Sequence, residues 1–226
     1  MSETYDPMRH AGSLTAEHTG LPFDGKPVRR VVDASALPSY AFGHRGTLWW
    51  GNAGFALIEG FTLFLCAAAY FYVRRNFEAW PPPPTPPPDL LVPTANLVLM
   101  LVALAPAWYV VRAAKRLELG GVRLGLIALL ALEAVVLVLR WYEFKALNTR
   151  WDSHAYGSDA WATMGFHSTL IILDFGESIG WLLLAFSSRL MEKHFPDYCE
   201  NSYYWSFVVG SWVPLYVMLF LFPRWV

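Results

Sequence analysis

Five stretches of the chain are almost entirely apolar, and each is long enough to cross a lipid bilayer as an α-helix. A membrane-spanning helix needs roughly 20 mostly apolar residues. None of the five shows the alternation of apolar and polar residues that a transmembrane β-barrel requires. The pattern therefore predicts an all-α integral membrane protein, a bundle of five transmembrane helices. The predicted helices cover residues 47–73, 90–111, 122–144, 158–187 and 203–222.

The chain before the first predicted helix has a different character. Residues 1–46 contain no apolar stretch and carry scattered proline, glycine and charged residues. We expect residues 1–46 to form a polar, mobile N-terminal arm and residues 47–226 to form one membrane domain. Because the arm has none of the features of a cleavable signal peptide, we expect the first predicted helix to act as the insertion signal.

Lysine and arginine residues predict the orientation, because cytoplasmic loops of membrane proteins carry an excess of them. Of the 17 Lys and Arg residues, 11 lie in the arm and around the ends of the second and fourth predicted loops, and 6 lie on the opposite side. The N-terminus is therefore expected in the cytoplasm and the C-terminus outside.

Composition agrees with a membrane protein and narrows the possible partners. Apolar residues make up 55% of the chain and charged residues only 15%, whereas about a quarter of a soluble domain is charged. A net charge of −1 excludes a basic nucleic-acid binder, so we expect no nucleic-acid partner. Two cysteines, Cys66 and Cys199, are too few for a disulfide framework or a four-thiolate metal site.

Proline dominates the loop after the first predicted helix, from Trp80 to Pro88. Such a run favours an extended left-handed helix without internal hydrogen bonds. The loop is interpreted either as a stiff spacer between two helices or as a rigid arm lying on a neighbouring subunit. Pro106 and Pro214 lie inside the second and fifth predicted helices and are expected to kink them.

Glu59 lies near the middle of the first predicted helix, between Ile58 and Gly60. An ionisable group at membrane depth is costly, so its presence is a functional hypothesis by default. One interpretation is a neutral glutamic acid hydrogen-bonded to a neighbouring helix. The other is a residue that contacts a lipid headgroup in a cleft or exchanges a proton.

The third predicted helix carries Glu133, Arg140 and Glu143. Arg140 and Glu143 are three positions apart, so they lie within one helical turn and are expected to pair near the outer end of the helix. We interpret this pair as structural rather than catalytic.

The fourth predicted helix carries His167, Asp174 and Glu177, at spacings of seven and three positions. These spacings place the three side chains on one helical face. Such a polar face is expected to contact protein or an aqueous cavity and not lipid tails.

The histidines do not suggest a cofactor site, because only His167 of the six lies within a predicted span. A haem needs axial ligands, usually His, and a copper centre needs His or Cys with Met. A Glu-x-x-His pair for a di-iron bundle and a phosphate-binding glycine loop are both missing from the sequence. We therefore expect this chain to contain no catalytic residue, no cofactor and no metal.

Four short motifs of aromatic, glycine and charged residues follow one another along the chain. They are Gly54-Phe55 with Glu59, Trp80-Pro81-Pro82, Leu139-Arg140-Trp141-Tyr142-Glu143, and Tyr156-Gly157-Ser158 with Gly165-Phe166-His167. In this order they resemble subunit III of the haem–copper respiratory oxidases, the cytochrome c oxidase type in particular. The fuller form of that family has seven helices, and this chain resembles the later five.

The resemblance implies an accessory, cofactor-free subunit III of a proton-pumping oxidase that reduces oxygen to water in aerobic respiration. Haem and copper would belong to the partner subunits, the catalytic subunit I and subunit II. The accessory subunit would stabilise subunit I, its bound phospholipids and its proton uptake, in the inner (plasma) membrane of a bacterium. The residues expected to face lipid or a cleft are Glu59 first and His167 second.

Two other interpretations fit the same residues. Five-helix relatives also occur as accessory subunits of quinol oxidases and with nitric oxide reductase. A small proton channel or transporter, a different class of protein, would use Glu59, His167, Asp174 and Glu177 as a relay.

Overall fold

Five long α-helices make up most of the computed structural model, which describes residues 40–225, and no β-strand occurs in that range. Each helix is long and apolar enough to cross a membrane, so the predicted all-α fold with five helices able to span a membrane is confirmed. The arm predicted for residues 1–46 falls, up to residue 39, outside the described residues. The helices are α1 (Thr47–Arg74), α2 (Leu91–Lys115), α3 (Leu119–Ala146), α4 (Ala155–Ala185) and α5 (Phe195–Tyr216).

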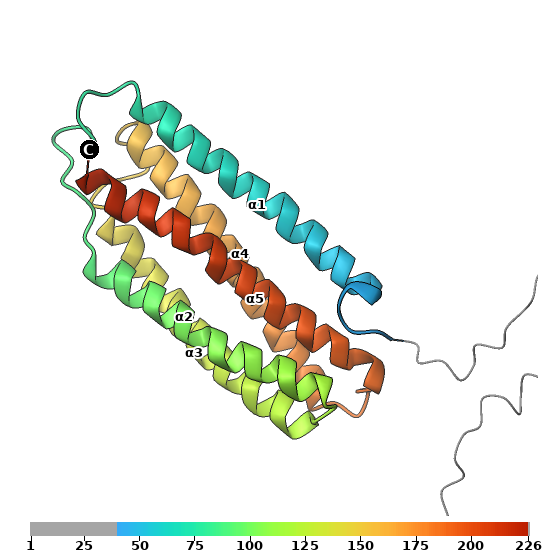
Figure 1. Ribbon diagram of the computed structural model, residues 1–226. Helices are drawn as coiled ribbons and strands as arrows, with labels where there is room; N and C mark the ends of the chain where they lie inside the picture. The colour runs from blue at the N-terminus through green and yellow to red at the C-terminus, as the bar shows by residue number, and fades with distance from the viewer. Residues whose placement is uncertain (1–39, 226) are drawn as a thin grey trace, which may run out of the picture. The chain divides into compact units, whose positions relative to one another are not determined.

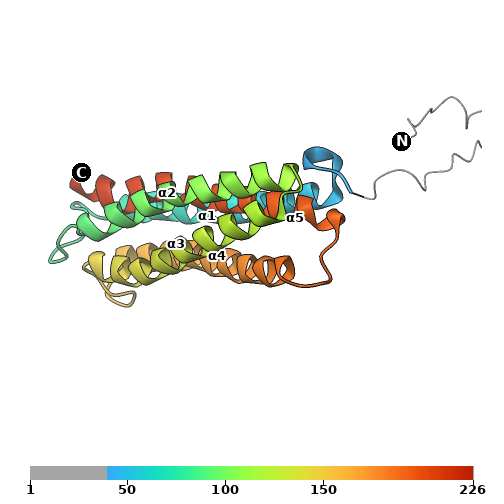
Figure 2. The ribbon, with the colours of Figure 1, turned by 90° about the horizontal axis from the view of Figure 1, so that it is seen from below.

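The helices form two layers (Figures 1 and 2). One layer holds α1, α5 and α2, and the other holds α4 and α3. Short loops join α2 to α3 and α3 to α4, so these neighbours run antiparallel. In Figure 1, α1 lies at one edge of the bundle, and its main helix neighbours are α4 and α5.

Helix α1 is the least buried of the five helices. Only 11% of its most apolar stretch is buried inside the chain, compared with 50% for the last span, Glu192–Arg224, which contains α5. Phe55, Phe61 and Phe64 are exposed on it. In a bilayer such a face costs little, because lipid tails are as apolar as the phenylalanine rings.

Helix α5 begins earlier than its apolar pattern predicts, at Phe195 instead of residue 203. The first turns carry polar residues, among them Glu200 and Asn201, which are buried against the rest of the bundle. Asn201 Nδ2 donates a hydrogen bond to Ser178 Oγ on α4 at 2.9 Å. A hydropathy window misses such turns because their residues are polar, although the neighbouring helices bury them.

The end of α5 differs from a regular helix where proline interrupts it. Pro214 has no backbone N–H to donate, and one turn later the chain forms a π-helical turn, Val217–Leu221. The hydrogen-bond pattern therefore changes one turn after Pro214, while the kinks expected at Pro106 and Pro214 stay predictions.

The proline-rich loop is not a continuous extended helix. Thr85 N donates a hydrogen bond to Pro82 O at 3.0 Å, which closes a turn within the run. Trp80 is buried, and its Nε1 donates to Tyr70 Oη of α1 at 2.8 Å. The Trp80 ring centroid also lies 4.8 Å from that of Tyr156 on α4. The loop therefore folds back onto the chain's own helices.

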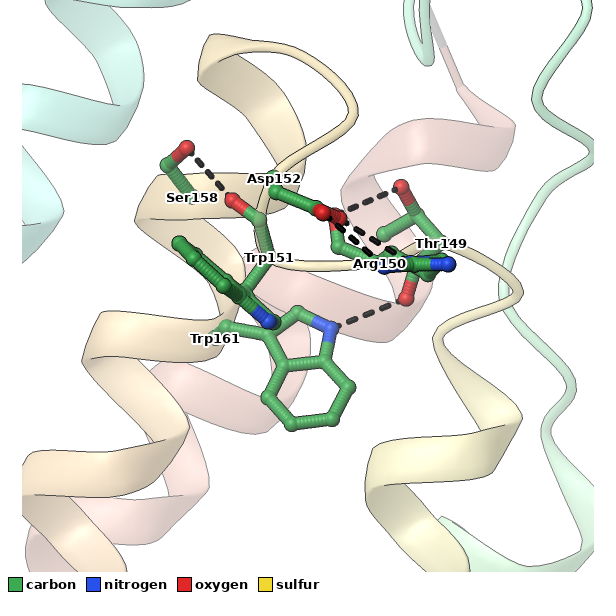
Figure 3. Close-up of polar contacts among 6 residues, drawn as sticks. All are labelled: Thr149, Arg150, Trp151, Asp152, Ser158 and Trp161. Carbon is green, nitrogen blue, oxygen red and sulfur yellow. Dashed lines mark hydrogen bonds and ion pairs between the residues drawn. The ribbon is translucent and has the colours of Figure 1, made fainter.

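The loop from α3 to α4 is fastened to the first turns of α4 (Figure 3). Trp161 Nε1 donates to Thr149 O at 2.8 Å, and Ser158 Oγ donates to Trp151 O at 2.7 Å. A Cβ atom added to Gly157 would collide with Arg150 O. Glycine is therefore needed at position 157 for the close approach of the loop.

Glycine also sets the packing of α2 against α3. A Cβ atom at Gly125 would lie 2.5 Å from Val110 Cγ2 and 3.1 Å from Tyr109 Cδ1, whereas one at Gly165 on α4 would meet nothing within 4 Å. We predict that Gly125→Ala lowers the free energy of unfolding by about 1–3 kcal/mol through overpacking. Gly165→Ala, the matched control, should be neutral or slightly stabilising. Thermal unfolding of the full chain in lipid discs measures both, and equal midpoints would contradict the proposed close packing.

Candidate functional site

A cleft of about 270 Å³ opens between α1, α4 and α5. Its polar lining consists of three carboxyl side chains, one amide and one phenol, and the remaining lining residues are apolar or glycine. Among residues 40–225, no lysine, arginine or histidine lines it. The cleft is therefore acidic and has apolar walls. Its lining residues are Leu48, Gly51, Asn52, Phe55, Glu59, Leu173, Glu177, Glu200 and Tyr204.

Glu59 reaches the cleft from the middle of α1, as a half-buried side chain. Tyr204 Oη of α5 donates a hydrogen bond to Glu59 Oε2 at 2.7 Å. Glu59 therefore has a helix–helix hydrogen bond and also lines a cleft, so both interpretations of this residue fit its position. The remaining carboxylate oxygen is not held by Tyr204.

A second contact joins α1 to α5 near the start of α1. Asn52 Nδ2 donates to Glu200 O at 2.8 Å and lies 3.4 Å from Glu200 Oε2. Asn52 and Glu59 are seven positions apart, so both lie on the face of α1 that meets α5. These two polar contacts hold the otherwise sparsely packed α1 beside the cleft.

His167, Asp174 and Glu177 do not share one environment. His167 and Asp174 are fully buried, whereas Glu177 is exposed and lines the cleft. Glu177 Oε1 accepts a hydrogen bond from Trp181 Nε1 at 2.9 Å. The structure therefore brings Glu177 to the cleft that Glu59 lines and leaves His167 away from it.

The Arg140–Glu143 pair predicted from their spacing is present, and it is almost completely buried. Arg140 Nη1 lies 2.7 Å from Glu143 Oε2, and the two side chains are 3% and 0% exposed. The Arg140 guanidinium also lies over the Trp212 ring of α5, 3.8 Å from its centroid. A buried ion pair with these additional contacts is a structural feature of a helix bundle.

Both ring nitrogens of His167 have partners. His167 Nε2 lies 2.9 Å from Val208 O of α5, which can only accept a hydrogen bond. Nε2 is therefore the protonated nitrogen, and Nδ1 accepts from Arg140 Nη2 at 3.2 Å. This assignment leaves no free lone pair on His167 for a metal ion. Within residues 40–225, no group of three or more His, Cys, Asp and Glu side chains could hold a metal.

Sequence reasoning missed several residues around these sites. Glu200 lies before the apolar stretch that defined the fifth predicted helix, and Asn52 and Tyr204 carry no charge that would single them out. Asp159 could have been found, because it is an acidic residue at the start of the fourth predicted span. It is half-buried on α4, and its Oδ2 has no hydrogen-bond partner in the described chain.

Removing one partner of the buried ion pair tests its structural role. Arg140→Met leaves Glu143 buried without a counter-charge, and we expect a loss of roughly 3–5 kcal/mol in the free energy of unfolding. Combining Arg140→Met with Glu143→Gln removes both charges and should restore part of this loss. The thermal midpoints of the single and double variants measure the difference. A double variant less stable than Arg140→Met would contradict this role.

The chain is distantly similar to one curated protein, cytochrome c oxidase subunit 3 of Thermostichus vulcanus. The two are 26% identical over 159 residues, which cover 70% of this chain and 78% of the relative. No protein-family model matches the chain. At this level of identity the chain is similar to an oxidase subunit III and has five helices able to span a membrane.

Proposed function

We propose that the chain is an accessory subunit III of a haem–copper terminal oxidase of the cytochrome c oxidase type. The observation that carries the proposal is the similarity to cytochrome c oxidase subunit 3, which extends over 70% of the chain. The five spanning helices are consistent with it, since the sequence resembles the later five helices of that family. In such a complex the chain supports the reduction of oxygen to water, and another subunit catalyses that reaction.

In this proposal the haem and copper belong to partner subunits, subunit I as the catalytic one and subunit II. The position of His167 supports this division, because Arg140 and Val208 already occupy its two ring nitrogens. The exposed apolar side chains of α1 and of the other helices offer surfaces for lipid and for neighbouring subunits.

We assign Glu59 to the binding of a phospholipid headgroup in the cleft. The carboxyl groups of Glu59, Glu177 and Glu200 surround a space with apolar walls, a combination that suits an ammonium headgroup attached to acyl chains. Bound phospholipid would then fill the interface with subunit I and help to maintain its proton uptake. His167 is buried away from this cleft, so its assigned role is to hold α4 against α3 and α5.

The proposed location is the inner (plasma) membrane of a bacterium, with the N-terminus in the cytoplasm. The distribution of Lys and Arg residues supports this orientation. The cleft lies in the half of the bundle where α1 begins and α4 ends, so in this orientation it is nearer the cytoplasm.

Purification of the full chain from its native membrane tests the proposed role. We expect it to co-purify with larger membrane subunits and with the visible spectrum of haem a. A quinol oxidase or nitric oxide reductase would instead bring other haems. If the isolated chain conducts protons in liposomes and no haem protein accompanies it, the channel interpretation is correct and the proposal is wrong.

Replacing Glu59 tests the assigned lipid site within the assembled complex. Glu59→Ala should leave the initial rate of oxygen reduction largely intact, while the amount of retained phospholipid and the activity remaining after prolonged turnover both fall. Glu78→Ala, in the exposed loop after α1, is the matched control and should change none of these. A complete loss of electron transfer in an assembled Glu59→Ala complex would contradict an accessory role.

A further inference from the structure

Glu133 on α3 and Asp174 on α4 are two carboxyl groups buried completely inside the bundle. None of their four oxygens accepts a hydrogen bond from any donor in the described chain. Buried polar atoms are almost always hydrogen-bonded. Two buried carboxyls at membrane depth that accept no hydrogen bond therefore require an explanation.

The register of α3 against α4 places the two carboxyls opposite each other. Arg140 of α3 contacts His167 of α4 at 3.2 Å. The helices are antiparallel, Glu133 lies seven positions before Arg140, and Asp174 lies seven positions after His167. Glu133 and Asp174 are therefore each two helical turns from the Arg140–His167 contact, in the same direction along the bundle. At this level, Glu133 of α3 lies opposite Asp174 of α4. The two carboxyls are within hydrogen-bonding reach of one another.

A third helix brings a hydrogen-bond donor to the same level. Asn201 of α5 contacts Ser178 of α4 at 2.9 Å, and α4 and α5 are antiparallel. One turn from this contact, Asp174 lies on α4 and Trp205 on α5. Trp205 is fully buried, and its Nε1 has no partner in the described chain. The indole N–H and the carboxyl pair are thus orphaned groups at one level of the core.

Within the described part of the chain, no positively charged side chain compensates the two carboxyls. Arg140, the basic residue two turns away, is already paired with Glu143. The other titratable groups near Asp174 are Glu177 on its own helix and Tyr204 on α5, and neither carries a positive charge. Two ionised carboxylates in contact would repel each other in a medium that screens poorly.

We propose that Glu133 and Asp174 form a proton-binding site, in which a proton resides between the two carboxyl groups. A protonated carboxyl is a donor as well as an acceptor, so one proton supplies the hydrogen bond that neither ionised group can make. Trp205 Nε1–H, at the same level, is a further donor without a partner in the described chain. Glu177 lies three positions from Asp174 and lines the cleft, so the cleft side is the proposed route of proton exchange.

This inference does not depend on the proposed oxidase role, because it rests on the packing of α3, α4 and α5 alone. Infrared difference spectroscopy of the full chain, in the complex with which it purifies, tests it. The C=O stretch of a protonated carboxyl that shifts on deuteration should be lost in Glu133→Gln and in Asp174→Asn. Glu177→Gln, which removes a carboxyl outside the pair, should keep the band and slow its deuterium shift.

The amide variants are chosen so that the fold survives. A Gln or Asn amide donates to the carboxyl that remains, and the double variant Glu133→Gln/Asp174→Asn pairs two amides without charge. Circular dichroism checks the helical content of each variant. If a single variant does not fold, the difference spectrum between the wild-type protein and the double variant still tests the proposal. If folded variants lose no protonated-carboxyl band, the proposal is wrong. It is also wrong if Na⁺ in place of K⁺ raises the thermal midpoint of the wild-type protein only, because a metal ion would then occupy the site.

Discussion

The Arg140 side chain contacts every helix of the bundle except α1. It pairs with Glu143 on its own helix, lies 3.2 Å from His167 on α4, stacks on Trp212 of α5 and approaches Met100 Sδ of α2 at 3.8 Å. Inside a bilayer the apolar faces of helices gain little by leaving lipid for one another. Polar contacts and close packing then determine how the helices align. The contacts of Arg140 set the positions of α2, α3, α4 and α5 relative to one another at one depth in the bundle.

Helix α1 is held by other means, and the difference explains where the cleft lies. Its hydrogen bonds to α5 join Asn52 to Glu200 and Glu59 to Tyr204. Its far end is joined to the proline-rich loop through the hydrogen bond between Tyr70 and Trp80. Between these contacts few of its side chains are buried. A helix attached at separate points leaves space beside it, and the acidic cleft occupies that space along its first half.

Hydropathy was enough to predict the number of helices, because the lipid requires about 20 apolar residues in each span. It placed the start of α5 too late, since Glu200 and Asn201 are polar but buried. Glu59 could be singled out because a lone acidic residue in an apolar run is conspicuous. Its partner Tyr204 could not, because an aromatic residue in a membrane helix carries no signal of which helix it touches. The separation of Glu177 from His167 and Asp174 also depends on packing that the spacing alone does not contain.

Two side-chain pairs, which we call rungs, join α3 to α4. They are Arg140 with His167 and Glu133 with Asp174. Their spacing limits how the length of these helices can change during evolution. The rungs are seven positions apart on each helix. One inserted or deleted residue between them would turn one rung by about 100° relative to the other. A charged side chain would then face acyl chains. We therefore expect single-residue insertions and deletions in either segment to disrupt the packing of α3 against α4 more than point substitutions that preserve both contacts.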